Sequence, residues 1–252
     1  MLGLESMEST TEKTRRTLPN GEVVEFPAGM RQELALALVE PGQALLDVGC
    51  GRGAVAAALS PRFRRVHGVD GDEQALAAAE ARGIAVAQVD LDREPLPFAD
   101  AAFDAVVCLE VVEHVRDPAE LAREAARVLR AGGRLYLSTP NIRFAGYLRR
   151  LALGGRFPHT SDDPRGWQGG HVHFFTFTDV EELLRPRGFG DVRHHGLTPP
   201  RIRGSMPFRA VERTLGERLA REFLTVGIFT VATRGPGPLQ LPPRPSRELR
   251  SA

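Results

Sequence analysis

The chain has 252 residues, of which 42% are hydrophobic and 26% are charged, and its formal net charge at pH 7 is +1. These values are typical of a soluble domain and exclude a fibrous or wholly disordered protein. The near-neutral charge does not indicate nucleic acid as a partner, although residues 196–252 hold ten arginines against four glutamates.

The cationic residues and the cysteines exclude several classes of protein. Lys13 is the only lysine, which excludes a phosphate-loop lysine, a Schiff-base lysine and the Tyr-x-x-x-Lys pair of short-chain dehydrogenases. Cys50 and Cys108 are the only cysteines, too few for a disulfide framework and suited to a reducing compartment. No run of 18 apolar residues and no secretory signal is present, so we expect a cytoplasmic protein without membrane contact.

The two ends differ in composition from the middle of the chain. Residues 1–20 are polar without periodicity, and residues 235–252 contain five prolines. Neither segment buries enough apolar surface to offset its ordering entropy. We therefore expect a disordered leader (1–20), one domain (21–234) and a disordered tail rich in proline and arginine (235–252).

Between the ends, short apolar runs alternate with segments of helical periodicity. In chain order the strand-like runs are ALLDVG, RRVHGVD, IAVAQVD, FDAVVCLE and GRLYLSTP, separated by helix-like segments such as AVAAAL, EQALAAAEAR and a helix at 117–130. This alternation predicts an α/β fold with a doubly wound, mostly parallel sheet covered by helices on both faces. Helices at 179–187 and 209–221 and strands at 191–195 and 223–233 are predicted to complete it.

The alternation is interrupted after the fifth predicted strand. Residues 140–178 contain many glycines and prolines, the only tryptophan and five of the thirteen phenylalanines. An insertion of this length in a compact domain is usually functional, so we expect a lid over an acceptor site. Its predicted apolar walls are Trp167, Phe157, Phe174 and Phe175, and the arginines that we expect to meet an anionic acceptor group are Arg143, Arg149, Arg150 and Arg156.

A glycine-rich loop follows the first of these strands. Its sequence is Asp47-Val48-Gly49-Cys50-Gly51-Arg52-Gly53, and the three glycines allow a tight turn that leaves room for a ligand. The dehydrogenase pattern G-x-G-x-x-G needs a glycine where Ala54 stands. A carboxylate at position 47 would repel a pyrophosphate and attract the α-amino group of a sulfonium cofactor. This pattern disfavours a nicotinamide oxidoreductase.

Acidic residues end the next two strands. Asp70 closes VHGVD, where an acid commonly binds both ribose hydroxyls of an adenosine. Asp90 closes AVAQVD and precedes Leu91, a pair able to bond an adenine amino group and cover its ring. Ligands of open α/β sheets lie beyond the carboxyl ends of the strands, so Asp47, Asp70 and Asp90 are predicted to face one crevice.

Taken together, these motifs resemble a known family. The runs LLDVGCGRG, GVD, VDLD, FDAVVCLEVVEHV and LRAGGRLYLSTPN resemble the class I S-adenosylmethionine-dependent methyltransferases over roughly residues 26–234. EVVEHV, STPN and HVHFFTFT resemble most the branch of ubiquinone-type O-methyltransferases and related small-molecule methyltransferases. The resemblance implies a seven-stranded sheet with the last strand antiparallel, and S-adenosyl-L-methionine as cofactor.

The resemblance also implies roles for individual residues. Asp47, Gly49 and Gly51 would lie near the methionine moiety, Asp70 at the ribose, and Asp90 with Leu91 at the adenine. Leu109 would pack under the cofactor, and Arg31 would reach its carboxylate. The full predicted cofactor-binding set is Arg31, Asp47, Gly49, Cys50, Gly51, Asp70, Gly71, Asp90, Leu91, Leu109 and Glu110.

The segment Glu110-Val111-Val112-Glu113-His114 has three interpretations. The spacing i, i+3, i+4 predicts that Glu110, Glu113 and His114 share one helical face at the mouth of the crevice. They could orient neighbouring loops, or His114 could act as general base, or a divalent metal could be held by these three residues with His171. Some ubiquinone-type and small-RNA 2′-O-methyltransferases resemble the last arrangement. We favour the metal-free version, with His114, Glu113 and His171 as the catalytic set.

The function that these features favour is methyl transfer from S-adenosyl-L-methionine to an oxygen, or with less support a nitrogen, of a small organic acceptor. Two alternatives stay open. One is methylation of RNA or another macromolecule, although no basic-aromatic platform accompanies the basic C-terminal segment. The other is a cofactor-binding module without catalysis. The sequence makes no prediction of the oligomeric state.

Overall fold

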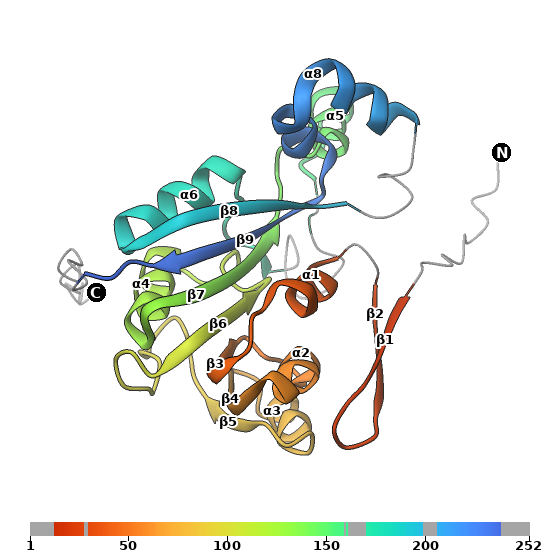
Figure 1. The fold of residues 1–252 in the computed structure, drawn as a ribbon. Helices are drawn as coiled ribbons and strands as arrows, with labels where there is room; N and C mark the ends of the chain where they lie inside the picture. The colour runs from red at the N-terminus through yellow and green to blue at the C-terminus, as the bar shows by residue number, and fades with distance from the viewer. Residues whose placement is uncertain (1–12, 28–29, 159, 161–169, 199–205, 238–252) are drawn as a thin grey trace, which may run out of the picture.

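The computed structural model describes residues 13–27, 30–158, 160, 170–198 and 206–237. A seven-stranded sheet runs through its centre, and a separate two-stranded hairpin stands beside it (Figure 1). The strands of the sheet are, in spatial order, β5 (Ala85–Gln88), β4 (Phe63–Asp70), β3 (Gly42–Val48), β6 (Phe103–Leu109), β7 (Leu129–Pro140), β9 (Gly227–Arg234) and β8 (Phe189–Leu197).

The sheet is parallel from β5 to β7, and β9 is antiparallel to both of its neighbours. Successive side chains of a strand point to opposite faces. Leu45 and Leu46 of β3 accordingly enter different apolar clusters, and both are fully buried. The predicted α/β fold and its antiparallel last strand are confirmed.

Helices cover both faces of the sheet (Figure 1). The helices α1 (Arg31–Leu38), α2 (Ala54–Leu59) and α3 (Glu73–Glu80) pack on one face, and α4 (Pro118–Val128) and α6 (Phe177–Leu184) pack on the other. The remaining described helical elements are η1 (Ser60–Arg62), α5 (Ala145–Gly154), η3 (Arg185–Arg187) and α8 (Met206–Leu224), the last interrupted by the non-helical Gly216.

Side-chain caps begin two of these helices as the sequence indicates. The carboxylate of Asp72 accepts hydrogen bonds from the first-turn amides of α3, and Asp117 does the same for α4. The helix predicted at 117–130 is too long, because α4 ends at Val128 and the chain passes directly into β7, where Leu129 pairs with Phe103.

The predicted disordered leader is wrong for residues 13–20. The strands β1 (Lys13–Thr17) and β2 (Val23–Pro27) form an antiparallel hairpin with a turn between them. The physical reason is burial: Leu18 in the turn is 3% exposed and packs against residues of α2 and α3. Residues 1–12 and 238–252 lie outside the described residues.

The insertion after β7 is tied at its base. Asn141 and Phe175 form an isolated β-bridge, and the amide of Ile142 donates to the carbonyl of Phe175. The buried side-chain amide of Asn141 donates to the carbonyls of Glu222 and Thr225. The two ends of the insertion are therefore held together next to the start of β9. Among the residues that the structure describes, no helix combines the length and the apolarity needed to cross a membrane.

Candidate active site

The glycine loop between β3 and α2 has a backbone that only glycine adopts easily. Gly49, Gly51 and Gly53 have φ of 68°, 51° and 74°. The amides of Gly49 and Cys50 donate to the carbonyl of Val69 on the neighbouring strand. A Cβ atom on Gly49 would lie 2.3 Å from Cγ2 of Val111, so this position also lacks room for a side chain.

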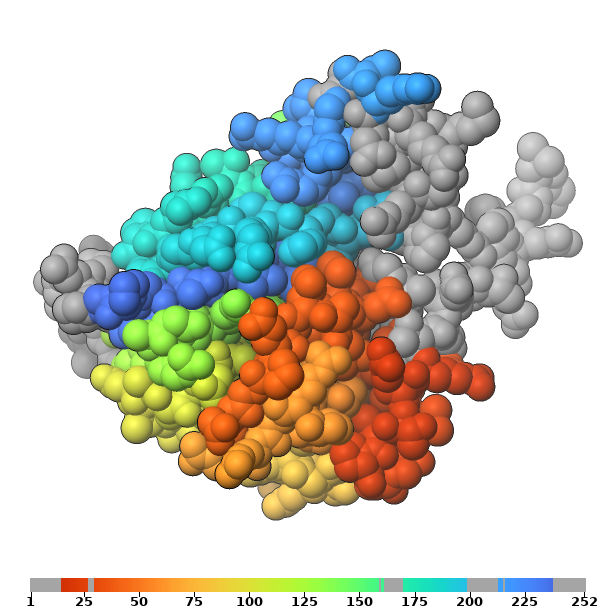
Figure 2. All heavy atoms as spheres, in the orientation of Figure 1, coloured from red at the N-terminus to blue at the C-terminus, as the bar shows by residue number. Residues whose placement is uncertain are grey.

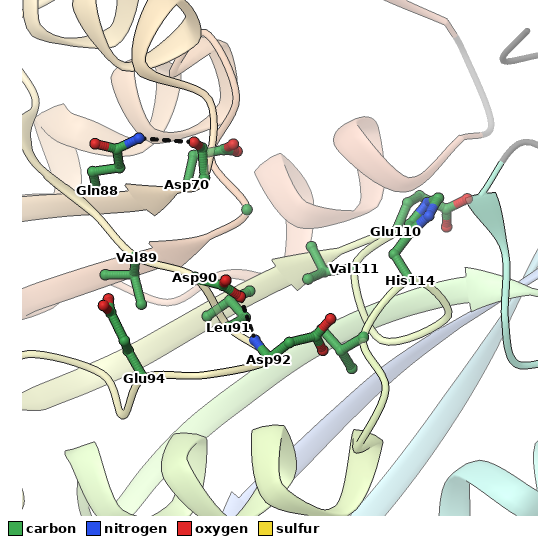
Figure 3. Close-up of a pocket in the computed structure, with 13 residues that line it drawn as sticks. Asp70, Gln88, Val89, Asp90, Leu91, Asp92, Glu94, Glu110, Val111 and His114 are labelled. Atoms are coloured by element: carbon green, nitrogen blue, oxygen red, sulfur yellow. Dashed lines mark hydrogen bonds between the residues drawn. The ribbon is translucent and has the colours of Figure 1, made fainter. Parts of the chain in front are cut away.

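A cleft of about 750 Å³ opens at the carboxyl ends of the central strands (Figure 3). Six of the predicted cofactor residues line it, namely Gly49, Asp70, Gly71, Asp90, Leu91 and Glu110. His114, from the predicted catalytic set, lines it as well. Six further lining residues are not predicted from the sequence, namely Gln88, Val89, Asp92, Glu94, Val111 and Val115. Most of them adjoin Asp90 or Glu110 in the chain, and this proximity is the one signal that points to them.

The strand-end acids of the cleft also bind backbone amides. Asp70 accepts from the amide of Gly51 at 2.8 Å and from that of Asp72 at 3.0 Å. Asp90 accepts from the amide of Asp92 at 3.0 Å. Asp70 therefore holds the glycine loop in addition to facing the cleft.

Three predicted cofactor residues have side chains behind the cleft. Asp47 is buried, accepts a hydrogen bond from the amide of Ala56, and has its pKa raised to about 7 by burial and by the charge of Asp70. Cys50 packs in the apolar cluster behind the loop, where burial raises the pKa of its thiol to about 12. Leu109 packs against the cluster on the α1 face. Gly51 does not line the cleft either.

The segment from Glu110 to His114 is a turn, which contradicts the predicted helix. β6 ends at Leu109, and Glu110 adopts the left-handed conformation with φ of 57°. The amide of His114 then donates to the carbonyl of Val111, which makes one tight turn before α4 begins. This geometry places Glu110 and His114 in the cleft wall and buries Glu113 behind them.

The turn and the end of the insertion form a cluster of three ionisable side chains. Ligand-type atoms of Glu113, His114 and His171 all lie within 4.8 Å of one another. The His114 and His171 rings meet edge to face with centroids 4.5 Å apart. Nδ1 of His171 bonds to Oγ1 of Thr160 at 2.6 Å, and Nδ1 of His114 to the carbonyl of Gly170 at 3.2 Å. The predicted catalytic set is therefore brought together.

Glu113 is the most deeply buried member of this cluster. It is 1% exposed, and no described residue hydrogen-bonds to either of its carboxylate oxygens. Burial and the charge of Glu110 raise its pKa, against smaller opposing effects of Thr139 and Arg31. Its backbone carbonyl accepts from the amides of Val172 and His173, so the turn and the end of the insertion are joined directly.

A second cavity of about 390 Å³ adjoins the turn. It shares Glu110 and His114 with the cleft, and His171 and Arg31 line it. Its other lining residues are Met30, Pro140, Tyr147, Thr160, Leu197, Val226 and Gly227. Arg31 lies 3.8 Å from the Glu110 carboxylate. This arginine lines the second cavity and does not line the cleft.

The predicted aromatic walls of the acceptor site are wrong for the residues that can be placed. Phe157 and Phe174 contact each other, with ring centroids 5.1 Å apart, and Phe175 is buried in the core; none of these three lines either cavity. Trp167 lies outside the described residues. The arginines predicted to meet an anionic acceptor do not line the cavities either: Arg143 pairs with Glu222, and Arg149, Arg150 and Arg156 are exposed.

Comparisons with known proteins find similarity to methyltransferases. A family model described as a methyltransferase domain matches residues 46–137. The ubiquinone biosynthesis O-methyltransferase of Ralstonia nicotianae is 32% identical over 169 residues, which are 65% of this chain and 66% of the relative. A probable S-adenosylmethionine-dependent methyltransferase of Mycobacterium tuberculosis is 42% identical over 160 residues, 63% of this chain and 53% of the relative. Residues 46–137 belong to the methyltransferase-domain family, and the chain is similar to S-adenosylmethionine-dependent methyltransferases over about two thirds of its length.

The chain spans about half to two thirds of the length of these curated relatives. Solved structures show the same fold. An S-adenosylmethionine-dependent methyltransferase of Mesorhizobium loti is 24% identical with a TM-score of 0.56, covering 82% of this chain and 99% of that one. The [4+2]-cyclase SpnF is 22% identical with a TM-score of 0.58, covering 84% and 83%.

The cluster of Glu113, His114 and His171 also fits a divalent cation. One carboxylate and two imidazoles are donors that Zn²⁺ and Mn²⁺ accept, and the buried carboxylate has no described hydrogen-bond partner. Glu110 is not part of the cluster. Its carboxylate accepts from the hydroxyl of Ser138 at 2.8 Å. The four-ligand set considered from the sequence is thus reduced to three.

Proposed function

We propose that this protein transfers a methyl group from S-adenosylmethionine to an oxygen of a small organic acceptor. The observation that supports this best is that the two cavities meet at Glu110 and His114. The larger cleft would take the cofactor and the smaller cavity the acceptor, and the reacting atoms would meet at the shared wall. The ubiquinone biosynthesis O-methyltransferases among the relatives support oxygen as the target.

The residues of the cleft have separate tasks in this proposal. Asp70 would bind the ribose hydroxyls while it holds the amide of Gly51, and Asp90 with Leu91 would bind the adenine. Bound in the cleft, the cofactor supplies an electrophilic methyl group on its sulfonium. Because methyl transfer is an in-line displacement, the chain contributes mainly by fixing the geometry of donor and acceptor and by excluding water.

His114 is the proposed general base for an acceptor hydroxyl. Its ring lies where the two cavities meet, and histidine is the side chain that most often serves as a general base. A hydroxyl that gains a methyl group must lose its proton, which His114 would accept. Glu113, behind the ring in the same cluster, would stabilise the resulting imidazolium, and His171 would orient the ring from the side of the insertion.

The test is turnover with a methyl-labelled donor against separate pools of small metabolites and of RNA. We expect label in the metabolite pool, as methyl ethers or esters. His114→Ala should lose turnover and still bind S-adenosylhomocysteine, while His195→Ala, a histidine of β8 that lines neither cavity, should behave as the unmodified protein. Label confined to RNA, or binding of the cofactor without turnover in any pool, would refute this function.

A further inference from the structure

The β1–β2 hairpin lies against the back of the cofactor loop. Leu18 of its turn belongs to the same buried cluster as Cys50 of the glycine loop and Ala56 and Ala57 of α2. Figure 2 shows the hairpin, in red, packed directly beside the orange segment that contains α2 and α3. This hairpin takes no part in the seven-stranded sheet, so its packing does not serve the pairing of strands there.

A partly buried arginine connects the hairpin to the loop. Nε of Arg82, just after α3, donates to Oε2 of Glu22 at 2.8 Å, and Nη2 pairs with Oε1 of the same carboxylate. Nη1 of Arg82 donates to the backbone carbonyl of Arg52 in the loop. The Arg82 side chain is only 14% exposed. A two-point contact of this kind fixes the orientation of a guanidinium better than a single one.

The carbonyl that receives this bond lies between two glycines of the loop. Arg52 stands between Gly51 and Gly53, and glycine loses more conformational freedom on ordering than any other residue. On the cleft side the loop is held by Asp70 through the amide of Gly51. Arg82 holds it from the opposite side, so that the loop is fixed on both.

We propose that Glu22 and Arg82 are positioning residues of the cofactor site, through which the hairpin preorganises the glycine loop before the cofactor binds, an inference that rests on the proposed function. Preorganisation raises affinity because less ordering entropy is lost on binding. Neither residue lines the cleft or the second cavity. Their effect therefore reaches the cofactor through the carbonyl of Arg52.

The experiment compares Glu22→Gln and Arg82→Gln with the control Glu25→Gln. The control removes an exposed ion pair of the same hairpin, between Arg15 and Glu25 at 2.9 Å, that does not reach the loop. We expect amide hydrogen exchange of residues 49–53 without ligand to be faster in the two test variants. The Kd for S-adenosylhomocysteine should rise about tenfold, the equivalent of about one hydrogen bond, and the KM for the cofactor should rise with kcat unchanged.

A charge-swapped double variant, Glu22→Arg with Arg82→Glu, separates positioning from general stability. The double variant restores the ion pair but places no donor near the Arg52 carbonyl. Its Tm should therefore match that of the unmodified protein, whereas its loop exchange should stay fast and its Kd should stay high. Two results would overturn the inference. One is that Glu22→Gln and Arg82→Gln show the same exchange rates and the same Kd as Glu25→Gln. The other is that the double variant regains the Kd of the unmodified protein. If the unmodified protein binds no S-adenosylhomocysteine, the proposed function fails, and the exchange comparison alone decides whether the pair holds the loop.

Discussion

At the scale of single residues, two buried carboxyl groups lie behind the walls of the cavities. Asp47 lies under the glycine loop and Glu113 under the turn that follows β6, and burial raises the pKa of both. An ionised carboxylate in such a place costs folding free energy unless it is paired or hydrogen-bonded. We therefore expect both groups to make the free energy of unfolding depend measurably on pH.

Replacing Asp47 by asparagine should change the pH dependence of stability. In the folded protein the pKa of Asp47 is raised to about 7 from 3.8. The stabilising contribution of this group is therefore fully present below the pKa of the unfolded chain, and it is lost as the pH rises through the pKa of the folded protein. Asparagine stays neutral. We compare the free energy of unfolding of Asp47→Asn with that of the unmodified protein at each pH. This difference should increase by roughly 1 to 4 kcal/mol from pH 4 to pH 8.

Urea unfolding at several pH values without ligand measures this difference. Asp104 provides a comparison of opposite sign, because Arg130 and the amides of Gln43 and Ala44 hold the pKa of its carboxyl below the usual range. Its stabilising contribution is present above the unfolded pKa and is lost as the pH falls. A stability difference for Asp47→Asn that does not vary with pH would contradict the burial argument.

The roles of Glu113, His114 and His171 can be separated by substitution and by metal removal. If His114 acts as a general base alone, His114→Ala should lower turnover by roughly 100-fold or more without changing cofactor affinity, and chelators should have no effect. If a cation is held, Glu113→Gln should be as damaging as His114→Ala, and activity lost to a chelator should return with Mn²⁺ or Zn²⁺. We expect the first pattern.

Glu110→Gln serves as the comparison for this test, because Glu110 lies outside the three-residue cluster. If a cation is held by the cluster, the Glu110→Gln variant should respond to chelators as the unmodified protein does. Full activity of His114→Ala together with indifference to chelators would exclude both versions and leave only an orienting role for the turn.

At the scale of elements, Asn141 joins the insertion to the last strand. It is completely buried, and its side-chain amide donates to the carbonyls of Glu222 at 2.8 Å and Thr225 at 2.9 Å. Its Oδ1 accepts from the amide of Arg143. Pro140 and Tyr147, on either side of this anchor, line the second cavity, so the anchor places part of the proposed acceptor site.

Asn141→Ala should therefore damage acceptor binding more than cofactor binding. Two buried carbonyls would lose their partner, at an expected cost of about 2 to 4 kcal/mol in the free energy of unfolding. We expect the KM for the acceptor to rise while the Kd for S-adenosylhomocysteine stays within about twofold of the unmodified protein. Arg149→Ala, on the exposed part of α5, is the control. Equal losses in both ligand affinities would show that the two cavities are not independent.

At the scale of the whole molecule, cofactor binding should stabilise the fold because the cleft is assembled from the ends of several strands. A ligand at about 100 times its Kd adds about 2.7 kcal/mol to the free energy of unfolding, which for a chain of this size raises the Tm by roughly 5 to 10 °C. Calorimetry with S-adenosylhomocysteine measures this shift. Asp90→Ala, in the cleft wall, should reduce it, and Asp100→Ala, outside the cleft, should not. No shift in the unmodified protein would count against the cleft as cofactor site.

The parts of the site that were predictable from sequence are those set by short-range pattern. Asp70 ends β4, and the glycine loop, Asp90 and Leu91 come shortly after strands. The carboxyl ends of neighbouring parallel strands meet at one edge of the sheet. The caps Asp72 and Asp117 were equally local. The spacing i, i+3, i+4 predicts a helix from Glu110, but the same spacing also fits a tight turn. The left-handed backbone of Glu110 decides for the turn.

The second cavity and the hairpin contacts depended on the tertiary structure. Leu197, Val226 and Gly227 reach the second cavity only because β9 inserts antiparallel between β7 and β8, and no local pattern around them indicates a ligand. Glu22 and Arg82 are 60 residues apart in the chain, and each alone resembles an ordinary surface charge. Side-chain periodicity indicates which face of an element is buried. Contacts between distant segments are set by how the elements pack, and only that packing brought these residues together around the proposed site.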